Sequence, residues 1–250
     1  DAPKAANLIS LKPGLNAGQW RDSQDGLAGG RYPFDVNAVF VPAALNAIAR
    51  FVDSGVLNPY LTSEQRQQLA SASRMAKTWS REAPKQFDVR IARADARRQI
   101  ADYAQQMNVN AAAALDALPD RELIVNAIAL DEKFQPIPVV HSDGGFALLL
   151  QDPSAAEVER LVETMLRPFP AGLLTDAGLL VANPAFVDRD TQRKFDTTAY
   201  HGTVVWSWQQ ALLAAGLDRQ IARKDLPKAT KARLEDARKR LWSVIDGTRE

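Results

Sequence analysis

The sequence has 250 residues, of which 46% are hydrophobic and 24% are charged, as in an ordinary folded protein and unlike a disordered or collagen-like chain. Its 31 Lys and Arg are nearly balanced by 30 Asp and Glu, so it lacks the concentrated basic charge of a dedicated nucleic-acid-binding protein. No cysteine is present, which excludes disulfide scaffolds, cysteine-ligated zinc and cysteine nucleophiles. No apolar run approaches the ~18 residues of a membrane span. We therefore expect neither a nucleic-acid partner nor a membrane partner.

The ends of the sequence indicate processing. The chain begins at Asp1 without a Met, and the last predicted helix runs almost to Glu250. We expect a mature, processed chain or a fragment of a longer protein. The lack of cysteine would suit a periplasmic or secreted location, and the sequence leaves the compartment otherwise open.

The first half of the chain is predicted to be mostly helical after a long loop. Glycine and proline are frequent in residues 1–34, which indicates a loop. From Asp35, interpreted as an N-cap, an apolar stripe with helical spacing predicts a helix to about Gly55. Further elements are predicted at 63–83 (helix), 86–91 (short strand), 93–107 (helix) and 110–118 (helix).

Residues 121–140 are the most strand-like stretch. β-Forming residues on either side of a turn at 131–133 predict a small hairpin inserted between helices at the rim of a cleft. A loop-rich region follows at 167–198, and long loops inside a compact domain are usually functional. The remaining helices are predicted at 143–150, 154–166, 202–215 and 228–246.

A glycine-rich loop near the start carries the first candidate motif. Aromatic faces stack on the C–H surfaces of sugars, and Asp, Asn and Arg side chains hydrogen-bond to hydroxyl groups, so this composition suits a ligand-binding loop. A polar surface loop anchored by its tryptophan would explain the same composition equally well. The candidate ligand-binding residues are Trp20, Arg21, Asp25, Tyr32, Asp35 and Asn37.

Two later motifs place polar and aromatic residues before predicted helices. Trp206 and Trp208 are two residues apart and cannot both face one side of a helix, so one can pack in the core while the other points into a cleft. Buried tryptophans and an N-capping cluster are the alternative interpretation. The candidate binding residues of these motifs are His141, Asp143, Tyr200, His201, Trp206 and Trp208.

Several enzyme classes are excluded by missing motifs. The sequence has no G-x-S-x-G elbow, no Walker loop and no G-x-G-x-x-G fingerprint after a strand. Its two histidines are far apart in sequence, so a zinc site is not predicted. We expect neither a metal nor an organic cofactor.

Taken in order, three motifs resemble the catalytic domain of the six-hairpin glycosidases. The likeness is greatest to the amylo-α-1,6-glucosidase part of glycogen-debranching enzymes and to the related α-glucosidases and trehalases. The W-x-D element of that group is similar to residues 20–22, its L-T-x-x-G-L element to residues 174–179, and its Y-H element leading into G-T-V-W-x-W to residues 200–208. Ser207 stands where the family often has proline, and one residue between the family's His and Gly is missing.

The resemblance implies a mainly α fold. It predicts an (α/α)6 toroid, present here as an incomplete, C-terminal part with a small β insertion near 121–140. Residues 1–250 would belong to one catalytic domain, with 1–34 as the active-site loop region and 35–250 as helical hairpins. The missing segments of the toroid would then be a partner of this chain.

The resemblance also implies an inverting glycoside hydrolase that acts on α-glucosidic or related oligosaccharide linkages, with Asp22 as the general acid. The family's base is a Glu beyond the W-x-W helix. After Trp208 the only glutamates are Glu235, expected on a helix surface, and Glu250. A non-catalytic carbohydrate-binding or structural toroid is the main alternative. A sugar epimerase or lyase on the same fold is a third, in which the histidines would matter more than Asp22.

Overall fold

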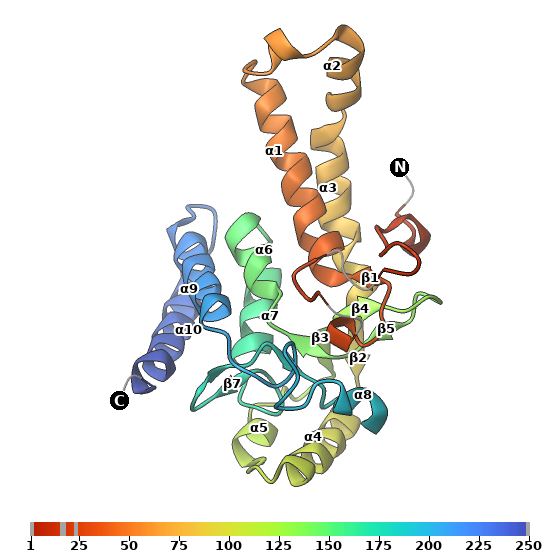
Figure 1. The fold of residues 1–250 in the computed structure, drawn as a ribbon. Helices are drawn as coiled ribbons and strands as arrows, with labels where there is room; N and C mark the ends of the chain where they lie inside the picture. Colours follow the sequence, from red (N-terminus) through yellow and green to blue (C-terminus); the bar gives the residue numbers. More distant parts are fainter. Residues whose placement is uncertain (1–2, 16–18, 23–24, 249–250) are drawn as a thin grey trace.

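The computed structural model describes residues 3–15, 19–22 and 25–248 of the chain (Figure 1). The protein is mainly helical, with 54% helix and only short strands. This confirms the mainly α fold class that the sequence predicts.

A long helical hairpin projects from the rest of the molecule (Figure 1). The π-helix η3 (Asp35–Phe40) runs directly into α1 (Val41–Asp53), and after α2 (Ser63–Leu69) the chain returns along α1 as α3 (Ala72–Glu82). Trp79 Nε1 of α3 donates to the Asn37 carbonyl at 2.5 Å and holds the base of the hairpin together. By length and composition alone, the continuous helix over 35–53 is long and apolar enough to cross a membrane. Core helices of soluble proteins meet the same criterion.

The start of this helix differs from the expectation. Phe34 occupies the N-cap position, and Asp35 is the first helical residue. Among the described residues, the side chain of Asp35 bonds only to the backbone of Val36, one residue on, so the predicted capping role is wrong. The buried position of Asp35 is fixed by the tertiary packing described below and not by helix capping.

A second group of helices forms the body beside the hairpin (Figure 1). Helix α6 packs against α9, and α10 packs against both α9 and α7. The helices of the body and of the lower part of the molecule are α4 (Arg93–Met107), α5 (Ala112–Asp116), α6 (Gly144–Leu150), α7 (Ala155–Leu166), α8 (Arg189–Arg193), α9 (Ser207–Ala222) and α10 (Lys228–Gly247).

Helix α9 begins later than the predicted helix over 202–215, and it also ends later. The residues before it are drawn into loop contacts: Thr203 N and Oγ1 both donate to the Phe195 carbonyl, and the Val204 carbonyl accepts from Val181. These long-range bonds compete with helix formation and delay the first helical residue to Ser207.

The strands pair segments that are distant in sequence. β4 forms a hairpin with β5, as expected within 121–140, but β4 also pairs with β1, β3 with β2, and β6 with β9. Strands within residues 121–141 therefore pair with the N-terminal loop, with the predicted strand at 86–91 and with the loop-rich region at 167–198. The expected simple inserted hairpin describes only the β4–β5 part of this region. The strands are β1 (Tyr32–Pro33), β2 (Asp88–Ile91), β3 (Leu123–Asn126), β4 (Ala129–Leu130), β5 (Pro136–Ile137), β6 (Val140–His141), β7 (Leu174–Thr175), β8 (Gly178–Leu179) and β9 (Ala182–Asn183).

Two glycines allow α6 and α9 to approach closely. A Cβ at Gly216 would lie 2.9 Å from Leu148 Cβ and 3.2 Å from the backbone nitrogen of Leu149. A Cβ at Gly145 would lie 2.9 Å from Leu212 Cδ2. The close approach brings the first turn of α9, which carries Trp208, against α6.

We expect Gly216→Ala to lower the free energy of unfolding by about 1–3 kcal/mol, because its Cβ meets atoms that no side-chain rotation can move away. The matched control is Gly247→Ala at the end of α10, where a Cβ meets nothing within 4 Å. Urea unfolding of both variants measures the difference. Equal stability of the two variants would contradict the close packing of α6 on α9.

Candidate functional site

A buried ion pair between Arg21 and Asp143 lies at the centre of the candidate site. The two side chains are 0% and 1% exposed. Arg21 Nε donates to Asp143 Oδ2 at 3.1 Å, Nη2 donates to Oδ1 at 2.9 Å, and Nη2 also donates to the Val181 carbonyl at 2.9 Å. This two-pronged geometry is the strongest form of the Arg–carboxylate contact. It fixes the N-terminal loop against the start of α6 and against the segment before β9.

Trp20 is held by the same carboxylate. Its indole Nε1 donates to Asp143 Oδ1 at 3.2 Å, and the Arg21 guanidinium carbon lies 4.2 Å from the centre of its ring. The Trp20 ring meets Trp208 and His201 edge-on, with ring centres 5.0 and 5.2 Å apart. Both residues that precede Asp22 are therefore fixed by contacts to residues more than a hundred positions away.

Asp22 is the exposed member of this segment. Its side chain is 66% exposed, and Oδ1 lies 3.5 Å from Nε2 of the buried His201. Burial, and next the charge of Arg21, hold the pKa of His201 below its ordinary value, against the opposing charges of Asp22 and Asp143. The carboxylate of Asp22 thus meets solvent beside a neutral imidazole.

Asp35 adds a second buried carboxyl to the cluster. Its Oδ1 accepts from Val36 N at 2.8 Å, whereas Oδ2 has no hydrogen-bond partner among the described residues. Burial raises the pKa of Asp35 to about 7, and the negative charge of Asp143 adds to the increase. Asp35 is therefore largely protonated below pH 7, and it begins a π-helix, a distortion that is frequent at functional sites.

His141 is the third titratable group beside Asp143. Its Nδ1 lies 3.5 Å from Asp143 Oδ2 and accepts a hydrogen bond from the Asp143 backbone at 3.3 Å. Burial lowers the pKa of His141 to about 4. The imidazole is accordingly neutral at neutral pH, which leaves Arg21 and Asp143 as the charged pair of the cluster.

The fold brings most of the predicted site residues together. Tyr200 stacks edge-on against His201 at 4.5 Å and against Trp206 at 4.7 Å, at the border of the cluster. Direct contacts or electrostatic interactions connect the members of the site, which are Trp20, Arg21, Asp22, Asp35, His141, Asp143, Tyr200, His201, Trp206 and Trp208.

Three predicted residues lie in other surroundings. Tyr32 packs on Phe134 in the β4–β5 hairpin, with ring centres 5.1 Å apart. The amide of Asn37 is used by the backbone of Ile9 and Pro33. Asp25 begins a short 3-10 turn outside the contacts of the cluster, but it lines a cavity of about 280 Å³ whose wall also includes Tyr200 and His201.

Aromatic residues that the motifs did not single out complete the cluster. Phe146 of α6 contacts Trp20 and Trp208, with ring centres 6.5 and 6.0 Å apart, and it also contacts Phe40 at 5.0 Å. Phe146 lies five residues after His141, and Phe40 belongs to the apolar stripe of the first helix. The stripe predicts Phe40 as a core residue, but no local pattern indicates that either ring lies beside the tryptophans.

Within residues 3–15, 19–22 and 25–248, no group of three or more His, Asp or Glu side chains is arranged to hold a metal ion. Comparisons with protein-family models, with curated proteins and with solved structures gave no match to this chain.

We expect that removing one partner of the Arg21–Asp143 pair is worse than removing both. Arg21→Met leaves a buried carboxylate without its cation, which costs on the order of 3–5 kcal/mol of unfolding free energy. The double variant Arg21→Met/Asp143→Leu removes both charges and keeps most of the volume, so we expect a smaller loss. Urea unfolding of the single and double variants measures this coupling.

The exposed pair Arg90–Glu122, which links β2 to the residue before β3, is the matched control. The same substitutions there should change the unfolding free energy by less than about 1 kcal/mol. Losses that simply add in the Arg21–Asp143 double variant would contradict a paired, buried charge.

The raised pKa of Asp35 predicts a pH-dependent stability. In the unfolded chain its carboxyl ionises near the ordinary value of 3.8, whereas the folded state keeps the proton to about pH 7. The contribution of Asp35 to the free energy of unfolding is therefore favourable at low pH and is lost progressively as the pH rises towards 7. We expect Asp35→Asn to gain stability over the unsubstituted protein across this window, on the order of 4 kcal/mol in total.

Unfolding curves from about pH 4 to about pH 8 measure this difference. Asp116→Asn, which changes an exposed carboxylate at the end of α5, is the control and should show no such trend. A constant difference between Asp35→Asn and the unsubstituted protein at every pH would contradict the shifted titration.

Proposed function

We propose that this protein is an inverting glycoside hydrolase acting on α-glucosidic or related linkages, with Asp22 as the general acid. One observation carries the proposal: an exposed carboxylate stands beside aromatic rings on a segment that a buried ion pair holds in place. Glycoside hydrolysis needs a carboxylic acid in a fixed position to protonate the leaving oxygen. The order of the sequence motifs supports the same activity by resemblance.

The rings around Asp22 offer surfaces on which a sugar can stack. Trp208 is 40% exposed and Tyr200 is 61% exposed, and both contact rings that adjoin Asp22. Apolar ring faces match the C–H faces of a pyranose, while the polar edges of Trp and Tyr remain able to hydrogen-bond. In this proposal Trp208 and Tyr200 form the sugar platform, and Trp20 and Arg21 position the acid.

The neutral state of His201 suits the proposed role of Asp22. A protonated imidazole at 3.5 Å would stabilise the ionised carboxylate and oppose proton donation. Burial and the charge of Arg21 disfavour that imidazolium. A sugar that covers Asp22 excludes water and so favours the protonated carboxyl, which is the form that a general acid needs.

The finer fold assignment belongs to the same proposal. The chain forms packed helical pairs, α1 with α3 and α9 with α10, which supports an incomplete α/α toroid with further hairpins as its partner. Glu235 lies exposed on α10, and Glu250 is outside the described residues, so neither is assigned as the base. A carbohydrate-binding toroid without catalysis is the second candidate, and it is favoured by the exposed rings together with this unassigned base.

We expect Asp22→Asn to lower kcat by about 10²–10⁴-fold on maltooligosaccharides, isomaltose or trehalose, because no acid then protonates the leaving oxygen. α-Glucosyl fluoride needs little help from an acid, since fluoride leaves without a proton. The variant should therefore keep most of its activity on the fluoride. The anomer of the released glucose, followed by NMR, tests inversion.

Asp116→Asn is the surface control and should leave both activities unchanged. Equal loss on both kinds of substrate would remove Asp22 from the role of acid. A larger loss in His201→Ala than in Asp22→Asn would favour an epimerase or lyase. Binding of these sugars without any turnover would favour the carbohydrate-binding function.

A further inference from the structure

A groove of about 760 Å³ lies between the projecting hairpin and the body of the protein. The hairpin wall includes Ala49 and Arg50 of α1 and Lys77 of α3, and the body wall includes Leu150 of α6 and Arg219 of α9. The groove contains none of the residues of the candidate glycosidase site, so it needs an explanation of its own.

The groove has a surplus of basic side chains. Its lining includes six basic and three acidic residues, although the whole chain carries a net charge of only +1. Arg81 and Lys85 pair with Glu82, Arg160 pairs with Asp88, and Arg219 pairs with Asp152. Arg50 of α1 and Lys77 of α3 line the groove without an ion pair to another described residue, so they carry its available positive charge. The basic residues are Arg50, Lys77, Arg81, Lys85, Arg160 and Arg219, and the acidic residues are Asp53, Asp152 and Glu157.

The floor of the groove is apolar. Phe34, Ala38, Ala147 and Leu161 are buried residues that reach its lining. Leu150, at the end of α6, is 44% exposed there. A groove with an apolar floor and a basic rim can bind a polypeptide segment that has an apolar stripe flanked by acidic residues.

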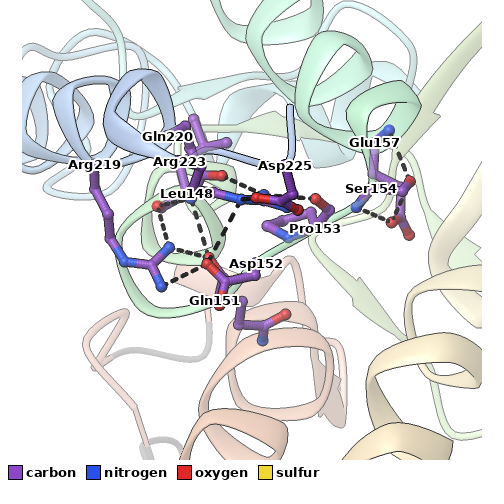
Figure 2. A network of polar contacts seen from close by, with 10 residues as sticks. All are labelled: Leu148, Gln151, Asp152, Pro153, Ser154, Glu157, Arg219, Gln220, Arg223 and Asp225. Atoms are coloured by element: carbon purple, nitrogen blue, oxygen red, sulfur yellow. Dashed lines mark hydrogen bonds and ion pairs between the residues drawn. The ribbon is translucent and has the colours of Figure 1, made fainter. Parts of the chain in front are cut away.

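The backbone of residues 151–154, which also line the groove, has its own hydrogen-bond partners. Figure 2 shows side chains at the end of α9 that bond to the segment 151–154. Gln220 Nε2 of α9 donates to the Gln151 carbonyl at 3.0 Å, and Nη1 of Arg223, the residue after α9, donates to the Pro153 carbonyl at 2.7 Å. Arg219 also donates to the Gln151 carbonyl and pairs with Asp152 at 2.8 Å. Gln151 in turn donates to the Val39 carbonyl at 2.8 Å, which ties this segment to the hairpin.

These hydrogen bonds determine which backbone conformation a polypeptide bound in the groove can have. The walls are helices whose backbone groups bond internally, and no described strand edge lines the groove. An extended peptide would find no row of free backbone groups with which to pair. A helix satisfies its own backbone groups and presents only side chains, so it fits such a groove.

We propose that this groove binds an amphipathic α-helix of a separate polypeptide, with its apolar stripe on the floor at Leu150 and acidic side chains beside Arg50 and Lys77. The inference goes beyond the proposed hydrolase and does not depend on it. The contacts are exposed to solvent at the rim, so the charge contribution weakens as salt is added.

A synthetic helix of about 20 residues is the probe, with Leu at helical spacing, Glu on both flanks and a fluorescent label. We expect it to bind the protein with a Kd below about 50 µM at low salt, measured by fluorescence anisotropy. The double variant Arg50→Glu/Lys77→Glu should weaken binding by about tenfold or more. The matched control, Lys228→Glu/Lys231→Glu on α10, reverses two charges outside the groove and should leave the affinity unchanged.

A second peptide, with every Glu replaced by Lys, should bind at least about tenfold more weakly than the first. Leu150→Asp tests the floor and should weaken the Glu peptide without altering the circular dichroism spectrum. The proposal is overturned if the Glu peptide does not bind, if the Lys peptide binds equally well, or if the α10 variant loses as much affinity as the groove variant. Sugar hydrolysis is not a readout here, so this result stands apart from the proposed hydrolase.

Discussion

The buried pair between Arg21 and Asp143 is the constraint on which the site depends. A guanidinium and a carboxylate removed from water are tolerated only when their hydrogen-bonding capacity is used inside the protein. Arg21 meets this requirement by donating Nη2 to the Val181 carbonyl at 2.9 Å and Nη1 to the His201 carbonyl at 3.5 Å. Four segments that are far apart in sequence must therefore meet at one point. Such a pair contributes more to fixing an arrangement than to net stability, because the desolvation of its charges offsets much of their attraction.

The same pair explains how three consecutive residues acquire different roles. Trp20 is half-buried against other rings, Arg21 is fully buried, and Asp22 is exposed. An irregular loop can turn successive side chains in different directions, which a helix or strand would do only with a fixed period. Because the side chains of Trp20 and Arg21 are anchored, the backbone that carries Asp22 is held in a fixed position. This is how a loop gains the rigidity that a reacting group requires.

The sequence predicted the helices well and the site only in part. The apolar stripe after Asp35 and the pattern at 228–246 have helical spacing, and spacing alone suffices to place a helix. The predicted start of α9 was wrong because Thr203 and Val204 bond to Phe195 and Val181. No local sequence pattern indicates such contacts.

The prediction of the site was incomplete for the same physical reason. Asp143 was expected to contact a ligand, but its two oxygens bond to Arg21 and Trp20, more than 120 positions away in the chain. The type of a residue indicates what it can bind. Only the fold determines which partner reaches it first, and for Asp143 that partner lies within the protein.

The arrangement of charge around Asp22 follows from these contacts. The neighbouring residue in sequence, Arg21, carries a full positive charge, which would hold a nearby carboxyl in its ionised form. Its side chain is turned into the protein and its charge is matched by Asp143 at 2.9 Å. Burial keeps His141 and His201 neutral at neutral pH, so the histidines add no competing cation. The cation that positions Asp22 is thereby paired with a carboxylate inside the protein, and the Asp22 side chain is left exposed beside the buried His201.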